Sequence, residues 1–124
     1  MIQQDGPGWR LARDPSRGQF CVLIGGASWA IELTDGEWRS LVALLIELQE
    51  QHQRLVSQLM AEEAISIELE RGVWWGELDG DRNSWSLSVV LTAEHARGAE
   101  GHWPDPAAAA MVAAMRTALD SNND

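Results

Sequence analysis

Histidine and carboxylate side chains, the usual ligands of a metal ion, gather in one polar stretch of the chain, TAEHARGAEGHWPD. Its two histidines, His95 and His102, are separated by a spacing that matches neither one face of a helix nor a zinc finger. Glu94, Glu100 and Asp105 add carboxylates of the kind that surface loops collect. We therefore interpret the stretch as a polar surface connection, and we expect no metal site and no cofactor.

A second acidic stretch, DGDRNSWSLSVV, resembles a calcium-binding loop at its start. Asp79, Asp81 and Asn83 occupy the first three ligand positions of such a loop. Ser84 stands where the loop needs glycine for its sharp turn, and Val90 stands where a bidentate glutamate is needed. This pattern predicts a hairpin loop and no calcium site.

Residues for nucleophilic catalysis are poorly placed in this sequence. Cys21 lies inside the apolar run QFCVLI, where desolvation disfavours the reactive thiolate. Gly25 and Gly26 are too few for a phosphate-binding loop and suit a two-residue hairpin turn. No nucleophile elbow or other catalytic signature is present. We predict that the protein is not an enzyme and has no catalytic residues.

Tryptophan and arginine together could bind single-stranded nucleic acid, because bases stack on indoles and guanidinium groups hold phosphates. The chain has seven Trp, one Phe and no Tyr, and all nine basic residues are arginine. The candidate surface for this alternative is Trp9 with Arg10, Arg13 and Arg17. A net charge of −10 opposes it, since binding a polyanion must overcome long-range repulsion.

A protein partner is the first prediction, because exposed tryptophan beside arginine is typical of an interface hot spot. The candidate interaction surface comprises Trp74 or Trp75 with Arg71, and Trp103 with Arg97. Neighbouring residues of a strand point to opposite faces, so Trp74 and Trp75 cannot both face the main core. We predict a small non-catalytic interaction or regulatory module.

The elements that must position these residues follow from hydrophobic periodicity. In the first half, short alternating or apolar segments at GWRLAR, QFCVLI and SWAIELT predict three antiparallel strands. Thr34 followed by Glu37 then predicts a capping box, and apolar residues at helical spacing predict a helix from Glu37 to about Met60. His52 lies on the apolar side of this helix, where we expect a packed, hydrogen-bonded histidine.

The second half repeats that order. ISIELE, VWWGEL and SWSLSVVL predict three strands, and AAAAMVAAMRTAL predicts a final helix. Trp29 and Trp85 occupy equivalent places in the two third strands, on the apolar face of each, and are expected in the core. The predicted fold is α+β, with two βββα units over approximately 8–62 and 63–120. We expect them to pack as an internal pseudo-dimer whose antiparallel sheets are covered by two helices.

This order of elements resembles the Whirly fold of single-stranded DNA-binding regulators. The chain is also similar to a family of uncharacterised cyanobacterial proteins assigned to that fold, through GWRLARDP, SWAIELTDGEW, LMAEEAISIELE, WWGELDG and RGAEGHWP. The resemblance implies a Whirly-like fold, with single-stranded nucleic-acid binding as the alternative function. The Lys-rich DNA-contacting motif of Whirly proteins has no counterpart here, because the chain contains no lysine. No site residue is therefore transferred.

Length and composition predict a single domain over 1–124 that is a monomer or a weak homodimer. No apolar run approaches the length of a membrane span, and the first residues lack the basic and apolar regions of a signal peptide. One cysteine permits no internal disulfide, which favours a cytoplasmic location.

Overall fold

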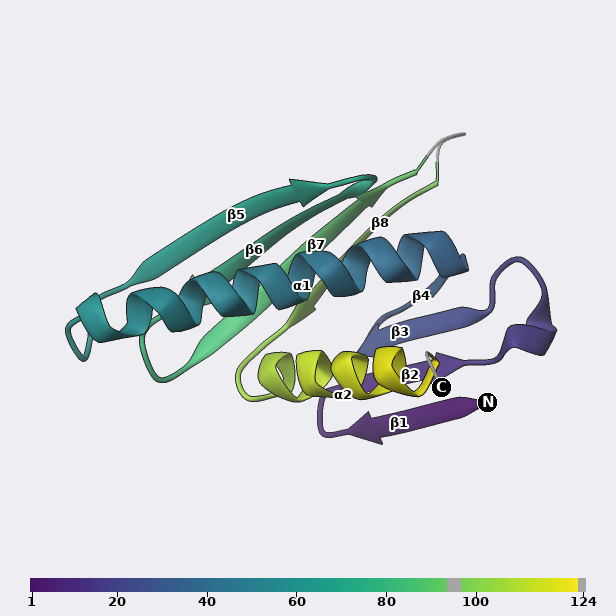
Figure 1. The fold of residues 1–124 in the computed structure, drawn as a ribbon, viewed down its shortest axis with the longest axis horizontal. Coiled ribbons are helices and arrows are strands. Elements are labelled where there is room, and N and C mark those ends of the chain that lie inside the picture. Colours follow the sequence, from purple (N-terminus) through teal and green to yellow (C-terminus); the bar gives the residue numbers. More distant parts are fainter. Residues whose placement is uncertain (94–96, 123–124) are drawn as a thin grey trace.

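Two antiparallel four-stranded sheets, each followed along the chain by a helix, make up the protein (Figure 1). The computed structural model describes residues 1–93 and 97–122. The first unit contains β1 (Ile2–Gly6), β2 (Trp9–Arg13), the 3-10 helix η1 (Pro15–Arg17), β3 (Val22–Gly26), β4 (Ala30–Leu33) and α1 (Asp35–Leu55). The second follows a 3-10 turn η2 (Val56–Gln58) and contains β5 (Ile65–Arg71), β6 (Trp74–Gly80), β7 (Trp85–Thr92), β8 (Gly98–Trp103) and α2 (Ala107–Asn122).

The predicted α+β class and the pseudo-dimer arrangement are confirmed, but each unit has four strands where the sequence predicted three. The additional strands are β1, with the sequence IQQDG, and β8, with the sequence GAEGHW. Both are edge strands rich in glycine and polar residues, which have low strand propensity. They are held by pairing with β2 and β7, a tertiary effect that local pattern does not report.

The turn between β3 and β4 also differs from the prediction. Gly25 and Gly26 lie within β3, and the chain turns through the next residues, with Gly26 N–H donating to the Trp29 carbonyl at 3.0 Å. A side chain at either glycine would collide with a neighbour, Arg10 at Gly25 and the Trp29 indole at Gly26. The glycines therefore give room to large side chains and do not form the turn.

Each helix covers the sheet of the other unit. Helix α1 packs on β5 and β6, whereas α2 packs on β1 and β2 and also reaches β7 and α1 (Figure 1). Alanines on the buried side of α2 allow close approach; the buried ones include Ala107, Ala108, Ala114 and Ala118. Because the helices are exchanged in this way, neither unit closes a core without the other.

The core is formed by alternate residues of both sheets and by the apolar side of each helix. Its largest members are the fully buried Trp38, Trp74 and Trp103. Trp29 and Trp85, expected in the core, are half-buried at its margin. No helix of the described residues covers the opposite faces of the two sheets, so these faces are open for contact with other molecules.

Helix α1 begins as the sequence predicted. Thr34 Oγ1 accepts from Glu37 N–H at 3.1 Å, and the Glu37 carboxylate accepts from Thr34 N–H at 2.9 Å, which completes the capping box. The α-helix ends at Leu55, before the predicted end near Met60. His52 is 4% exposed, and its Nε2 lies 2.8 Å from the Asp81 carbonyl, as expected for a packed, hydrogen-bonded histidine. Neither helix in the described ranges carries an apolar stretch that could span a membrane.

Candidate interaction site

Two of the three tryptophans proposed for an interface are internal. Trp74 is 2% exposed and its Nε1 donates to the Glu37 carbonyl at 2.9 Å, which ties β6 to α1. Trp103 is fully buried and its Nε1 donates to the Gly25 carbonyl at 2.9 Å, which ties β8 to β3. Both indoles join elements within the molecule. The prediction that Trp103 is an exposed anchor is therefore wrong, and of the alternatives Trp74 and Trp75 it is Trp74 that faces the core.

Trp75 points to the other face of β6 and is half-buried there. It lines a groove of about 440 Å³ on the open face of the second sheet. We call this the Trp75 groove; its lining is Trp29, Trp75, Ser88, Val89, Val90, Glu100, Gly101 and His102. Strand register explains the grouping, because Trp75 lies opposite Val90, and Val90 lies opposite Glu100.

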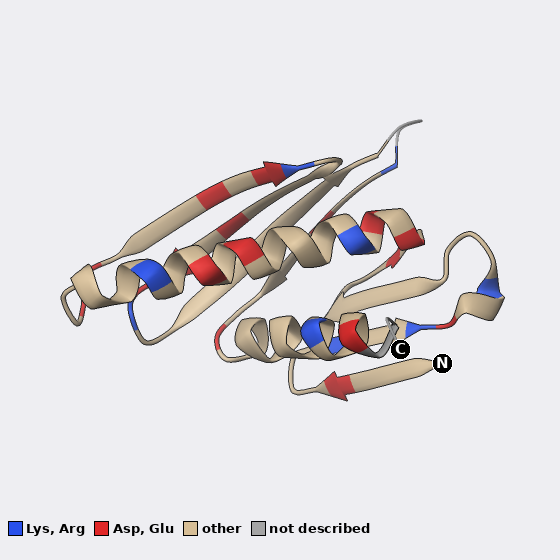
Figure 2. Cartoon of the chain, in the orientation of Figure 1, with Lys and Arg blue, Asp and Glu red and all other residues tan. Residues whose placement is uncertain are grey.

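The open face around this groove is acidic. Glu70 lies directly opposite Trp75 on β5, and Glu68 lies directly opposite Glu77 on the same strand pair. Carboxylates colour β5 and β6 red in Figure 2. Like charges directly opposite one another destabilise a sheet, so the Glu68 and Glu77 pair stores repulsion that a bound cation would relieve.

His102 contributes one polar contact inside the groove. Its Nδ1 lies 2.9 Å from Ser88 Oγ, across the pairing of β7 with β8. A hydrogen-bonded serine and histidine are two parts of a nucleophilic site, but the site also needs free donors for the developing oxyanion. Ser88 lies in an inner strand, where backbone N–H groups donate to neighbouring strands. The pair therefore shapes the groove, and the strand that carries Ser88 has its backbone donors engaged in pairing with β6 and β8.

Arg71 does not join Trp75. It is exposed at the end of β5 and lies opposite Trp74 in register, on the other side of the sheet from the Trp75 groove. The structure thus separates a pair that proximity in sequence had suggested. What brings residues together on a sheet is alternate spacing along a strand and pairing across strands.

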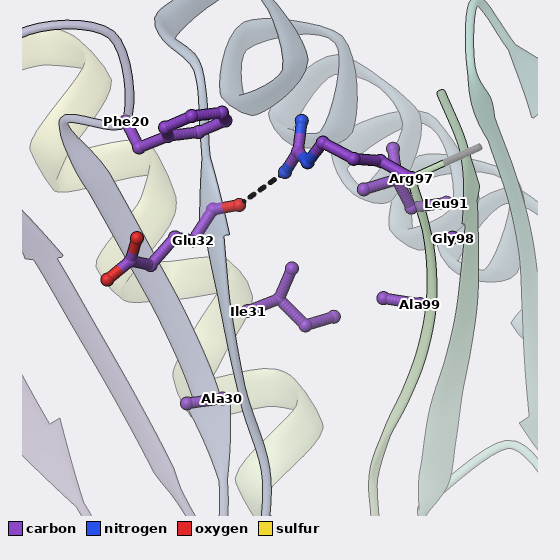
Figure 3. A pocket seen from close by; sticks show the side chains of 8 residues that line it. All are labelled: Phe20, Ala30, Ile31, Glu32, Leu91, Arg97, Gly98 and Ala99. Carbon is purple, nitrogen blue, oxygen red and sulfur yellow. Dashed lines mark hydrogen bonds between the residues drawn. The ribbon is translucent and has the colours of Figure 1, made fainter. Parts of the chain in front are cut away.

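Arg97 lies between the two sheets, at the start of β8. One of its nitrogens, Nη1, donates to both carboxylate oxygens of Glu37 at 3.0 and 2.8 Å, and Nη2 donates to the Glu32 carbonyl of β4 at 2.7 Å (Figure 3). The guanidinium carbon also lies 4.6 Å from the centre of the Phe20 ring. Arg97 is therefore a bridge across the space between β4 and β8.

That space is a second cavity, of about 480 Å³. We call it the seam; its lining is Phe20, Ala30, Ile31, Glu32, Leu91, Arg97, Gly98 and Ala99 (Figure 3). The other connection along the same pair of edges is Trp29, whose Nε1 donates to the His102 carbonyl at 3.1 Å. The indole lies at 55° to the Trp103 ring, with the ring centroids 5.0 Å apart, and covers Gly101.

Two of the three arginines proposed for nucleic-acid binding already have carboxylate partners. Arg13 is 11% exposed and donates to Asp35 Oδ1 at 2.7 Å, and its guanidinium lies over the Trp38 ring. The guanidinium groups of Arg13 and Arg39 hold the pKa of Asp35 below its usual value of 3.8. Arg17 pairs with Glu32 at 3.4 Å, and both side chains are about half exposed.

Arg10 and Trp9 remain together at one end of the first sheet. They line a cavity of about 510 Å³ formed where the β1–β2 and β3–β4 turns meet, together with Trp29 and glycine backbone. Of the four residues proposed for nucleic-acid binding, this pair alone shares a cavity within the described residues. A phosphate-binding path along Arg10, Arg13 and Arg17 is therefore not supported by the arrangement.

Two stretches were considered as metal sites in the sequence, the polar connection with His95 and His102 and the calcium-like stretch with Asp79 and Asp81. Glu94 and His95 lie outside the described residues, and within the described ranges no three His, Cys, Asp or Glu side chains are grouped to hold a metal. Asp81 of the calcium-like stretch accepts from the backbone N–H groups of Asn83 and Ser84, which lowers its pKa. That carboxylate closes the turn between β6 and β7.

Sequence reasoning missed Trp29 and Phe20 as site residues and considered His102 only as a metal ligand. Trp29 was assigned to the core of its own half, and nothing in its local pattern reports contact with β8, which lies more than seventy positions away. The usable signal was the glycine at position 101, because a glycine inside a strand often marks close approach of another group.

Two comparisons with known proteins find relatives of this chain. The family model described as "Domain of unknown function (DUF1818)" matches residues 4–118. A crystal structure from Prochlorococcus sp. NATL2A, described as a protein with unknown function from the DUF155 family, is 45% identical and superposes with a TM-score of 0.92. The match covers 96% of this chain and 99% of that one. No curated protein matches.

Proposed function

The chain belongs to the DUF1818 family of domains of unknown function, and we propose that it is a non-catalytic module that binds a basic segment of a partner protein. The binding surface in this proposal is the Trp75 groove. The observation that carries it is a half-buried indole on an uncovered sheet face, with carboxylates on both sides of it in register.

The geometry of the groove suits a cationic side chain. An arginine or lysine of the partner would lie over the Trp75 ring, since the face of an indole attracts a cation. Glu70 on β5 and Glu100 on β8 flank the row that contains Trp75 and Val90, and both carboxylates are exposed. A ring with flanking carboxylates recognises both the apolar stem and the charged end of such a side chain.

Charge supports the same choice of partner. The protein carries −10 overall, and the paired Glu68 and Glu77 repel one another on the open face. A basic segment would relieve that repulsion and be drawn toward the face from solution. We propose a regulatory or scaffolding role for this contact, in the cytoplasm.

The test begins with affinity capture by the immobilised protein, followed by titration of each purified partner against wild type and variants. We expect Trp75→Ala to weaken binding about thirtyfold, the loss typical of a hot spot worth about 2 kcal/mol. Glu100→Gln should weaken binding by a smaller factor than Trp75→Ala. That factor should be larger at low salt, where the charge of Glu100 is less screened. Ser86→Ala, on the same face but outside the groove, is the matched control and should bind as wild type.

The proposal fails if purified partners bind Trp75→Ala as tightly as wild type, or if the segments they present are acidic. Turnover in a broad screen of small-molecule substrates would also refute the non-catalytic part. The folding of wild type and of each variant is verified by circular dichroism before binding or turnover is measured.

A second candidate, binding of single-stranded nucleic acid, is favoured by the cavity that Trp9, Arg10 and Trp29 share. Indoles beside a guanidinium suit a stacked base and its phosphate, and the sequence resemblance to Whirly regulators supports this candidate. The test is retention of single-stranded DNA at physiological salt. Loss of retention in Arg10→Ala, but not in Arg17→Ala, would favour this candidate over the first.

A further inference from the structure

The two sheets present unpaired edges to each other across the seam. In strand order β4 ends the first sheet and β8 ends the second, and among the described residues no backbone hydrogen bond joins the two strands. Unpaired edges carry rows of N–H and C=O groups ready to pair with another chain. Here two such rows face one cavity.

Strand alternation shows which backbone groups face the seam. On β4, the Trp29 carbonyl pairs with β3, so Ala30 and Glu32 direct their backbone groups away from β3. On β8, the Arg97 carbonyl pairs with the β7 side through Ala93 N–H, so Gly98, Glu100 and His102 face outward. Two bridges, Arg97 to the Glu32 carbonyl and Trp29 to the His102 carbonyl, use one acceptor on each edge.

We infer that the seam is a strand-addition site, in which an extended segment of a partner protein pairs with β4, β8 or both. Paired neighbouring strands lie about 4.8 Å apart. The β4 and β8 edges do not pair directly at this point, where the Arg97 side chain reaches from one edge to the Glu32 carbonyl of the other. Small residues line the edges, at Ala30, Gly98 and Ala99, so a second backbone can approach closely. An extended chain alone offers the alternating donors and acceptors that match such edges.

The side chains around the seam specify the composition of that segment. Ile31 and Leu91 form its apolar wall. The Glu100 carboxylate lies on the open face of the second sheet, and the Glu32 carboxylate lies on that of the first in its exposed pair with Arg17, for which a basic residue of the segment would compete. Successive residues of an extended segment point to opposite sides. The segment that fits therefore alternates small apolar residues, directed onto Ile31 and Leu91, with basic residues directed toward the carboxylates.

This inference rests on the proposed function in that the ligand is a basic protein segment, but it uses a different kind of contact, backbone pairing along the seam. Glu100 belongs to both surfaces, whereas Ala30, Glu32 and Gly98 belong to the seam and not to the Trp75 groove. The probe is a synthetic peptide of alternating valine and lysine, titrated into the isotopically labelled full-length protein. We expect binding with a Kd below about 1 mM and slowed amide exchange at Ala30, Glu32, Gly98 and Glu100. A peptide of alternating valine and glutamate should not bind.

Ala30→Pro is the decisive variant, because it removes a donor that faces the seam and leaves the β3 ladder intact, as proline on an edge strand allows. It should weaken peptide binding at least about tenfold. Ser66→Pro is the matched control. Ser66 lies on β5, the opposite edge of the second sheet, where alternation directs its N–H to solvent, and binding should stay unchanged.

Three outcomes overturn strand addition. The first is that the amide signals of the seam residues do not change up to about 1 mM peptide. The second is that wild type and Ala30→Pro bind the peptide equally well. The third is that the signal changes are confined to the open face around Trp75. The last outcome would leave the proposed function standing. Conversely, protection along the seam with an affinity that Trp75→Ala does not alter supports strand addition and separates it from the Trp75 groove.

Discussion

A single methyl group at Gly101 tests how the two sheets are joined. A Cβ built there would lie within 2.7 Å of three carbons of the Trp29 ring, which is closer than real contacts allow. The ring has little freedom to move, because its Nε1 donates to the His102 carbonyl and it is in tilted contact with the Trp103 ring. We expect Gly101→Ala to destabilise the protein by about 1–3 kcal/mol, the usual cost of overpacking.

The sign of that effect should reverse when Trp29 is absent. Alanine is better than glycine inside a strand by about 0.5–1 kcal/mol, because it loses less backbone entropy on folding. In a Trp29→Ala background, Gly101→Ala should therefore stabilise the protein. Gly98→Ala on the same strand is the control, since its nearest neighbour, the Leu91 carbonyl, lies 3.6 Å from the added carbon. It should be neutral or mildly stabilising in both backgrounds.

Urea unfolding followed by far-ultraviolet circular dichroism gives these free energies for the four members of the cycle, provided the dependence on urea stays unchanged. The refuting result is an equal effect of Gly101→Ala with and without Trp29. It would mean that Trp29 does not occupy the space above β8, and that the seam is not closed at this end by the indole.

Three further predictions concern the core and the start of α1. Thr34→Ala should lower the free energy of unfolding by about 1 kcal/mol, as measured in urea, because the N-cap acceptor is lost. Trp103→Phe should cost about 1–3 kcal/mol more than Trp38→Phe in the same assay. Both indoles are fully buried, but Trp103 Nε1 donates to the Gly25 carbonyl, whereas Trp38 Nε1 has no acceptor among the described residues. Asp35, whose folded pKa is lowered, contributes stability that is complete above its usual value of 3.8 and is lost as pH falls through the folded pKa. The difference in urea midpoint between wild type and Asp35→Asn should therefore be large at neutral pH and should shrink as the pH falls below 3.8. A difference that does not change with pH would contradict the lowered pKa of Asp35.

Much of the local structure could be predicted from the sequence. The capping box at Thr34 and Glu37, the packed His52 and the alternation along β6 and β7 all depend on residues that are near one another in the chain. Periodicity and capping are properties of short segments, so they are readable without tertiary knowledge. The edge strand β8 was not readable in this way, because its pairing with β7 outweighs its own low strand propensity.

The candidate site depends on contacts that link distant segments. By itself, the sequence determined the α+β class, the repeated order of strands and helix, and the fact that Trp74 and Trp75 face opposite ways, since period and alternation are set locally. Only the tertiary structure decided that each helix covers the other unit's sheet, that Trp74 and Trp103 are internal, and that Arg97 and Trp29 span the seam. The physical reason is that burial and bridging are set by which surfaces meet, and no local pattern encodes the partner of a surface across sixty or more residues of chain.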